Sequence, residues 1–297
     1  MSFSAIFFTV VVPLCLFMIM AGLGLSLTVR DILRVIVMPK AVLIGLAGQM
    51  LLLPLLAFGL VELFSPPPVI AVGLILLAAC PGGITSNAYV FASRADVALS
   101  VTMTTISSML IVVTMPLLTW LALRAYAGTA VMVDLPIPEL MGKLALLTLL
   151  PIALGMSVRA RWPVFAARVL EPTRWTAIGL LLIVIVGNTI VSFHTLVDNM
   201  LEAGLVSFLL NVTGMGMGYG LARLGRLSPS QTVAITYEVG VQNISLVFTL
   251  AIAILGMPDY SVTALVYGLF MKSTALGFLV ISKRILAGEP EPEKVNV

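Results

Sequence analysis

The chain has 297 residues, of which 60% are hydrophobic and only 10% are charged, and its mean hydropathy is +1.16. A soluble domain of this size could not bury so much apolar surface, so a soluble globular protein is excluded. The formal net charge of +3 comes from basic residues divided among short segments rather than gathered on one face, which argues against nucleic acid as a partner.

Apolar stretches recur along the whole chain, and each is long enough to cross the roughly 30 Å hydrocarbon core of a bilayer as a helix. Nine such spans are predicted near residues 5–27, 38–60, 68–92, 97–123, 137–158, 173–193, 201–222, 230–256 and 261–283. The sequence therefore predicts an all-α integral membrane protein surrounded by lipid. No basic segment precedes the first stretch, so we interpret it as a retained span rather than a signal peptide.

The basic residues indicate how the chain is oriented. Thirteen of the sixteen Lys and Arg residues flank alternate loops or the C-terminus. The positive-inside rule then predicts an N-terminus outside the plasma (inner) membrane and a C-terminus in the cytoplasm, as an odd number of spans requires. Residues 287–297 are expected to form a short cytoplasmic tail.

Two of the predicted spans are interrupted in a similar way. In the third, Pro81 removes a backbone donor and the pair Gly82 and Gly83 loosens the chain further. In the eighth, Gly240 lies between Glu238 and two side-chain amides. Corresponding interruptions in two halves predict a transporter with inverted repeats and a binding site near the membrane midplane. The alternative is a pair of kinked helices whose polar side chains bond to neighbouring backbone.

Glu238 is the most informative residue of the chain. A carboxylate at membrane depth is expensive unless it faces protein, water or a cation. Other polar side chains are predicted at a similar depth, namely Gln49, Ser100 and Thr104, although hydroxyl groups in membrane helices often bond to backbone instead. Carboxylate, amide and hydroxyl oxygens suit a hard cation such as Na⁺, so we expect a cation site around Glu238.

Three segments resemble motifs of the bile acid:sodium symporter family. They are Cys80–Asn87, Asp96–Thr104 and Glu238–Asn243, and the resemblance extends over residues 12–285. It implies nine transmembrane helices in two domains, with two crossing broken helices in the core domain. The expected panel domain is residues 1–37 and 137–199, and the expected core domain is residues 38–136 and 200–286.

The resemblance also implies coupling to two Na⁺ ions, with no other cofactor, and it assigns residues to each site. The first sodium site would use Ser86, Asn87, Ser100, Thr104 and Glu238. The second would use Gln49, Glu238, Gln242 and the carbonyl groups of Val239 and Val241. The residues expected to bind the substrate are Gly83, Ile84, Thr85 and Asn243 from the motifs, together with Lys272, which is predicted from its depth in the last span and not from the resemblance. Glu238 is thus expected to serve both cations.

Two positions depart from the family pattern. Ile84 stands where the family often has Thr, which removes one expected hydrogen bond to the substrate. Lys272 lies about ten residues, or roughly 15 Å at helical rise, from either predicted membrane face, too far for easy snorkelling. Three interpretations of Lys272 stay open: a lysine in a water-filled cavity, a ligand for an anionic substrate, and a partner for Glu238.

These observations predict sodium-coupled uptake of an organic anion by alternating access. The anion is expected to be bile-acid-like or a small carboxylate such as pantoate. The alternative is a proton-coupled or exporting carrier of the same fold, and a third hypothesis is an anion receptor or channel. The sequence contains no motif of an intramembrane enzyme, so we predict that the chain is not an enzyme.

Overall fold

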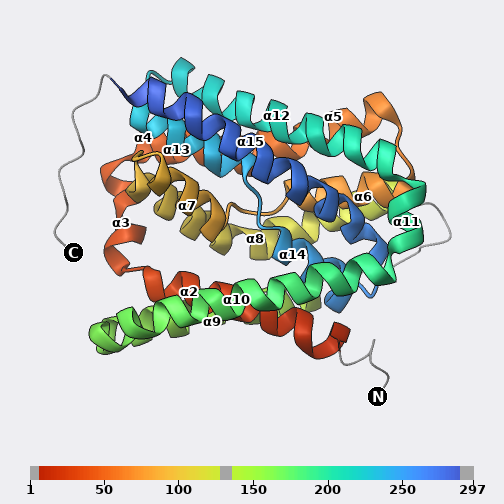
Figure 1. Ribbon diagram of the computed structural model, residues 1–297, viewed down its shortest axis with the longest axis horizontal. Coiled ribbons are helices and arrows are strands. Elements are labelled where there is room, and N and C mark those ends of the chain that lie inside the picture. Colours follow the sequence, from red (N-terminus) through yellow and green to blue (C-terminus); the bar gives the residue numbers. More distant parts are fainter. Residues whose placement is uncertain (1–6, 128–135, 288–297) are drawn as a thin grey trace.

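The computed structural model describes residues 7–127 and 136–287, and these residues are almost entirely helical (Figure 1). The predicted tail beyond residue 287 and residues 5–6 of the first predicted span lie outside this description. In chain order the helices are η1 (Phe7–Val11), α2 (Val12–Ser26), α3 (Val29–Val37), α4 (Pro39–Ala47), η2 (Gly48–Leu52), α5 (Leu53–Phe64), α6 (Pro68–Ala78), α7 (Ile84–Ala92), α8 (Val97–Tyr126), α9 (Ile137–Arg161), α10 (Pro163–Val191), α11 (Phe193–Asp198), α12 (Met200–Leu224), α13 (Pro229–Gly240), α14 (Ile244–Phe248), η3 (Thr249–Ile254), η4 (Pro258–Ser261) and α15 (Val262–Leu286).

Seven helical stretches in the described residues are long and apolar enough to cross a membrane. They are Thr9–Ser26, Pro39–Phe64, Val97–Tyr126, Ile137–Arg161, Pro163–Val191, Met200–Leu224 and Pro258–Leu286. Two further apolar helices are shorter, Pro68–Ala78 and Ile244–Ile254, and each belongs to one of the two interrupted spans. The prediction of a helical, multi-pass membrane protein is therefore confirmed.

Both predicted interruptions are present, and they lie against each other. Helix α6 ends at Ala78 and α7 begins only at Ile84, while α13 ends at Gly240 and α14 begins at Ile244. The two extended segments between these helices form an isolated antiparallel bridge that pairs Gly82 with Gln242. The backbone N–H of Asn243 also donates a 3.0 Å hydrogen bond to the carbonyl of Pro81. The backbone groups freed by each break are thus partly satisfied by the other break, as buried backbone in a membrane protein requires.

The helices differ from the prediction most clearly at α3 and at the start of α10. Residues 29–37, expected to be a loop, form helix α3, which begins with a capping box in which Asp31 accepts hydrogen bonds from the N–H and hydroxyl of Thr28. Helix α10 begins at Pro163, well before the predicted start at 173. Hydropathy indicates which part of a helix lies in the hydrocarbon core, but not where the helix itself begins or ends. The more polar first turns of α10 were therefore not predicted.

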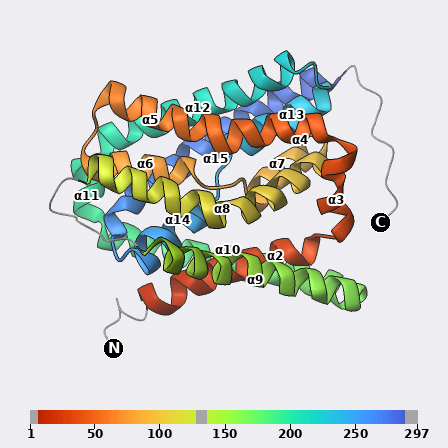
Figure 2. The same cartoon turned by 180° about the vertical axis from the view of Figure 1, so that it is seen from behind.

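Helices α2, α9 and α10 form a layer along one side of the molecule, visible in both views (Figures 1 and 2). Small residues let α2 and α9 approach closely, because a Cβ atom added at Gly24 would overlap the backbone of Ile152, and one at Gly155 would overlap the backbone of α2. The two interrupted spans lie on the other side of the molecule, together with α4, α5, α8, α12 and α15.

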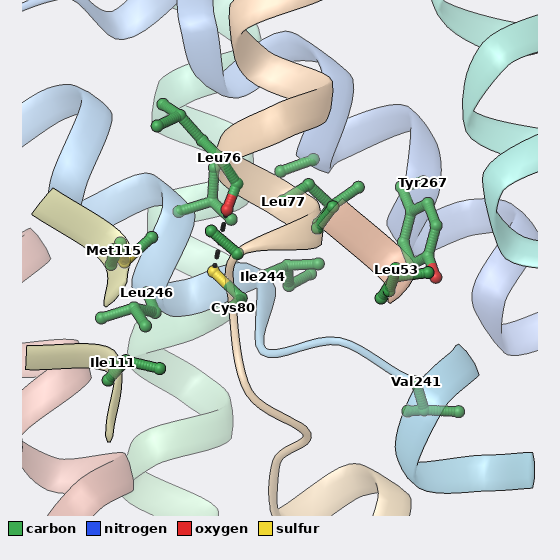
Figure 3. Close-up of a cluster of buried hydrophobic side chains, with 14 of the residues drawn as sticks. Leu53, Leu76, Leu77, Cys80, Ile111, Met115, Val241, Ile244, Leu246 and Tyr267 are labelled. Carbon is green, nitrogen blue, oxygen red and sulfur yellow. Dashed lines mark hydrogen bonds between the residues drawn. The ribbon is translucent and has the colours of Figure 1, made fainter. Parts of the chain in front are cut away.

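Apolar side chains pack around the two breaks and hold them in place. Figure 3 shows this cluster, in which Leu76, Leu77 and Cys80 from the first interrupted span meet Ile244 and Leu246 from the second. All five side chains are buried, and the thiol of Cys80 donates to the carbonyl of Leu76 at 3.4 Å. The irregular backbone is therefore enclosed by protein rather than exposed to lipid.

Candidate functional site

The carboxylate of Glu238 lies at the centre of a buried polar cluster. Glu238 is 1% exposed and sits two residues before the end of α13. Its Oε1 accepts hydrogen bonds from the hydroxyl of Ser86 at 2.7 Å and from that of Ser100 at 2.5 Å. Its Oε2 accepts from the hydroxyl of Thr104 at 2.8 Å. The structure therefore brings α7, α8 and α13 together at one carboxylate.

Asn87 joins the same cluster through its side-chain carbonyl. Its Oδ1 lies 2.6 Å from the hydroxyl of Ser100 and 3.4 Å from that of Thr104. All five residues predicted for the first sodium site are thus in contact with at least one other member. The prediction of their proximity rested on three separate sequence motifs.

This cluster holds more oxygen contacts than its protons can satisfy. The hydroxyl groups of Ser86, Ser100 and Thr104 make six hydrogen-bonding contacts to acceptor oxygens. Each hydroxyl has only one proton to donate, so with Glu238 ionised and the Asn87 amide in this orientation, three of the six contacts bring two oxygens together with no proton between them. A cation among these oxygens would replace that repulsion with attraction. The donor set of carboxylate, amide and hydroxyl oxygens fits a hard cation such as Na⁺.

Gly82 allows the first break to approach the carboxylate. A Cβ atom added at Gly82 would overlap Oε2 of Glu238 and would lie 3.1 Å from the hydroxyl of Ser86. The same addition at Gly83 would make only ordinary contacts, the nearest at 3.6 Å to Cβ of Asn243. Glycine is therefore needed at position 82 so that the backbone can pack closely against the carboxylate. From the sequence, Gly82 was predicted only to loosen the helix.

Residues predicted for the second sodium site form a separate network. Nε2 of Gln49 donates to the carbonyl of Cys80 at 2.6 Å and to Oε1 of Gln242 at 2.8 Å. Nε2 of Gln242 donates in turn to the carbonyl of Val239 at 2.7 Å. Gln49 lies in the π-helical turn η2, a feature often found at functional sites. Val241 caps α13 in an extended conformation and so belongs to the second break itself.

The carboxylate of Glu238 is not part of this second network in the structure. Within residues 7–127 and 136–287, the hydrogen bonds to this carboxylate all come from the hydroxyl groups of the first cluster. Glu238 is nevertheless the direct chain neighbour of Val239, so the two networks share one turn of α13. Their connection runs through the backbone.

A third network, which was not predicted from the sequence, surrounds the carbonyl of Gly240. The hydroxyl of Tyr267 donates to this oxygen at 2.7 Å, and Nδ2 of Asn211 donates to it at 2.8 Å. The hydroxyl of Thr274 donates to Oδ1 of Asn211 at 2.5 Å. An amide within an apolar span, as at Asn211, is a signal in the sequence that this side chain has a buried partner.

A cavity of about 650 Å³ lies between the α2–α10 side of the molecule and the two breaks. Its walls include all five residues predicted to bind substrate, which are Gly83, Ile84, Thr85, Asn243 and Lys272. Asn87 and Gln242, from the two polar networks, also line it. The volume falls in the range of small-molecule sites. The structure therefore connects the predicted ion-binding and substrate-binding residues through one cavity.

Two polar groups at this cavity lack partners among the described residues. Nδ2 of Asn243 is buried without a hydrogen-bond acceptor, while Oδ1 of the same side chain accepts from the N–H of Leu246 at 3.4 Å. Lys272 is exposed to the cavity and forms no ion pair within the described part of the chain. In particular, the structure does not pair Lys272 with Glu238, which was one of the three interpretations of this lysine. The remaining interpretations place water or an anion beside it.

Comparison with known proteins gives the family context of this site. A family model described as the Sodium Bile acid symporter family matches residues 13–199. The chain is 31% identical to the "Sodium-dependent organic anion transporter" of Bos taurus over 82% of its own length and 64% of that protein. It is 34% identical to the "Uncharacterized sodium-dependent transporter YocS" of Bacillus subtilis (strain 168), over 79% of this chain and 71% of the relative.

The match also extends to a longer mammalian relative. The chain is 31% identical to "Sodium/bile acid cotransporter 4" of Mus musculus, over 89% of its own length and 61% of that protein. The chain thus spans somewhat less than two thirds of the length of the bovine and mouse relatives.

Proposed function

Because this chain belongs to the sodium bile acid symporter family, we propose that it is a sodium-coupled symporter that takes up an organic anion. The family is one of membrane transporters rather than enzymes. The observation that carries the proposal is the cluster around Glu238, where three hydroxyl protons face six acceptor contacts. A buried anionic cluster with too few protons is a site for a cation.

In this proposal the first Na⁺ binds among the oxygens of Ser86, Asn87, Ser100, Thr104 and Glu238. Sodium binding would draw α7, α8 and α13 together, because these helices contribute different ligands to the same ion. The ion also compensates the charge of a carboxylate that is otherwise costly at this depth. The ion site therefore orders the region in which the two breaks meet.

A second Na⁺ would occupy the neighbouring network of Gln49, Gln242 and the carbonyl groups of Val239 and Val241. Amide side chains would turn their oxygens to the ion, as they supply a carbonyl oxygen as readily as an N–H. For Glu238 to serve this ion as well, its side chain would have to leave part of the first cluster. We therefore propose two ions linked through the α13 turn that carries both Glu238 and Val239.

The organic anion would bind in the cavity beside these ions. Backbone N–H groups at the start of α7, from Ile84 and Thr85, together with Nδ2 of Asn243 and the ammonium group of Lys272, offer donors to a carboxylate. A bile-acid-like steroid or a small carboxylate such as pantoate suits a cavity with these donors and with apolar walls. Binding of sodium would favour binding of the anion, since Asn87 and Gln242 belong to both regions.

Transport would follow from movement between two domains. We propose nine spans, of which α6–α7 and α13–α14 are the two broken ones and cross in the middle of the membrane. The panel domain would be residues 1–37 and 137–199, and the core domain residues 38–136 and 200–286. Rocking of the core against the panel would expose the cavity alternately to each side. The charge pattern supports an N-terminus outside the plasma (inner) membrane and a cytoplasmic C-terminus.

The proposal is tested in proteoliposomes that contain the purified protein, with taurocholate and pantoate as labelled probes. We expect an inward sodium gradient to drive accumulation of at least one probe, and an inward proton gradient without sodium to drive neither. Accumulation driven by protons alone would instead establish the proton-coupled alternative. Binding of a probe without exchange across the membrane would identify a receptor and overturn the transport proposal.

A further inference from the structure

The cavity beside the two breaks contains two positive charges and no negative one among the described side chains that line it. These charges belong to Arg174 and Lys272. No aspartate or glutamate reaches the cavity wall within the described residues. A cavity lined by two cations and by no anion attracts negative charge.

The two cations come from different walls of the cavity. Arg174 lies on α10, in the layer that α10 forms with α2 and α9, whereas Lys272 lies on α15 beside the broken helices (Figure 1). In both views α10 and α15 belong to different layers (Figures 1 and 2). A ligand that contacts both cations therefore bridges the two layers.

Lys272 lines the cavity together with residues of the second break. Gly268, one turn before Lys272, packs on Ile244, because a Cβ atom there would lie 3.1 Å from its side chain. Asn243 precedes Ile244 and presents a buried Nδ2 that has no acceptor among the described residues. Gly83, at the start of α7, lies against Asn243. Lys272, Asn243 and the start of the nine-residue helix α7 all line the cavity, and they offer it an ammonium group, a side-chain amide and a helix N-terminus.

Arg174 can form a second subsite. One guanidinium nitrogen, Nη1, lies 2.7 Å from the carboxylate of Glu171, on the same helix. Both side chains are largely exposed, at 41% and 63%, so this ion pair contributes little. The ion pair occupies one nitrogen of the planar guanidinium group, which has five N–H donors. The other edge of the group can still bind a carboxylate through two hydrogen bonds. Arg174 is therefore available to an anion that enters the cavity.

We propose that this cavity selects an organic dianion, with one anionic group at Lys272 and Asn243 and the other at Arg174. The inference rests on the proposed function and narrows its substrate class from organic anions in general to molecules such as dicarboxylates. It also predicts the net charge that crosses the membrane in each transport cycle. If two Na⁺ ions accompany each substrate, transport of a dianion moves no net charge, whereas transport of a monoanion moves one positive charge.

Binding is measured first, by thermal shift in sodium buffer, with straight-chain dicarboxylates from succinate to suberate and monocarboxylates of the same lengths. We expect the preferred dicarboxylate to bind about tenfold more tightly than its matched monocarboxylate, a difference of about 1.4 kcal/mol. Arg174→Gln should remove most of this preference, and Lys272→Gln should weaken binding of both acids. Arg168→Gln is the matched control, because Arg168 is an exposed arginine of the same helix that does not line the cavity.

Transport supplies the second readout. Sodium-driven uptake of the preferred dicarboxylate should be insensitive to an imposed membrane potential, and uptake of the monocarboxylate should be accelerated by a negative interior. Equal affinity for the two acid series would overturn the dianion proposal, as would equal losses of affinity for both acids in Arg174→Gln. Sodium-driven uptake of a monocarboxylate would in that case still support the proposed function. Failure of sodium to affect binding or uptake of any probe would instead overturn the proposed function itself.

Discussion

The hydroxyl group of Tyr267 donates a 2.7 Å hydrogen bond to the main-chain carbonyl of Gly240, at the residue where α13 ends. Asn211 donates to the same oxygen, so side chains of α12 and α15 together fix the orientation of one peptide group in the second break. The flanking residues, Val239 and Val241, carry the carbonyl groups proposed as ligands of the second sodium ion. In the proposed function, Tyr267 and Asn211 would be positioning residues, which act on the second sodium site through the backbone of Gly240.

Replacement of Tyr267 by Phe removes one of these two hydrogen bonds and leaves the ring in place. We expect the sodium concentration for half-maximal stabilisation to rise about tenfold, as is usual when a partner of a metal ligand is lost. The loss of one buried hydrogen bond should lower the free energy of unfolding by about 1 kcal/mol. Thermal unfolding with increasing NaCl measures both effects.

Tyr219→Phe on α12 is the control for this experiment, since no hydrogen bond of the Tyr219 side chain is found in the described residues. If Tyr267→Phe loses stability but keeps its sodium response, the role of Tyr267 is purely structural.

A methyl group at Gly82 should disrupt the Glu238 cluster. The Cβ atom of Gly82→Ala would overlap the carboxylate, so the side chain of Glu238 must move or the first break must shift. Overpacking of this kind costs about 1–3 kcal/mol, and the displaced carboxylate should bind sodium poorly. Sodium-dependent thermal shift and sodium-driven uptake should both fall.

The chain offers a matched control on α5. An added Cβ at Gly59 has no neighbour within 4 Å, so Gly59→Ala should be neutral or should stabilise the helix by up to about 1 kcal/mol. Equal sodium responses of the Gly82 and Gly59 variants would contradict the steric argument.

The sequence predicted the breaks and the residues around them because the cause of each break is local. Pro81, Gly82 and Gly240 each destabilise a helix at their own position. A carboxylate in an apolar span indicates a functional site wherever in the span it lies. Helix α3 was missed because Arg30, Asp31 and Arg34 resemble a loop when hydropathy is averaged, although its apolar residues follow a helical period.

The Gly240 network could not be predicted from the sequence, because its members are brought together only by folding. Asn211 and Tyr267 lie 29 and 27 residues from Gly240 along the chain. A polar residue in a span indicates that its side chain has a hydrogen-bond partner, but the identity of that partner depends on how the helices pack. The cavity is a similar case, since its walls come from α2, α7, α10 and α15, which only folding brings together.

Replacement of Gln242 by Leu should separate the two proposed ions. This change removes the side chain that links Gln49 to the carbonyl of Val239 and leaves the Glu238 cluster intact. If two ions act together in the native protein, uptake should depend sigmoidally on sodium, and Gln242→Leu should make that dependence hyperbolic with reduced maximal uptake. Initial rates of uptake over a range of NaCl concentrations provide the measurement.

Gln231→Leu, at the first turn of α13, is the control and should retain the native dependence of uptake on sodium. A hyperbolic curve in the native protein would mean that a single sodium ion is coupled.

Replacement of Glu238 by Gln tests the centre of the proposal. Gln preserves the size of the side chain but supplies no charge, and its amide group can donate to one of the surrounding hydroxyl groups and accept from another, which would relieve the shortage of protons without a cation. We therefore expect the variant to fold, to lose the thermal stabilisation by NaCl, and to bind sodium at least about tenfold more weakly, equivalent to about 1.4 kcal/mol or more. Glu202→Gln, an exposed acid on α12, should keep the native sodium response. Sodium-driven uptake that survives undiminished in Glu238→Gln would show that the coupling ion binds elsewhere. Because the protons of the cluster are fewer than its acceptor contacts, the same variant should be more stable than the native protein when both are measured without sodium.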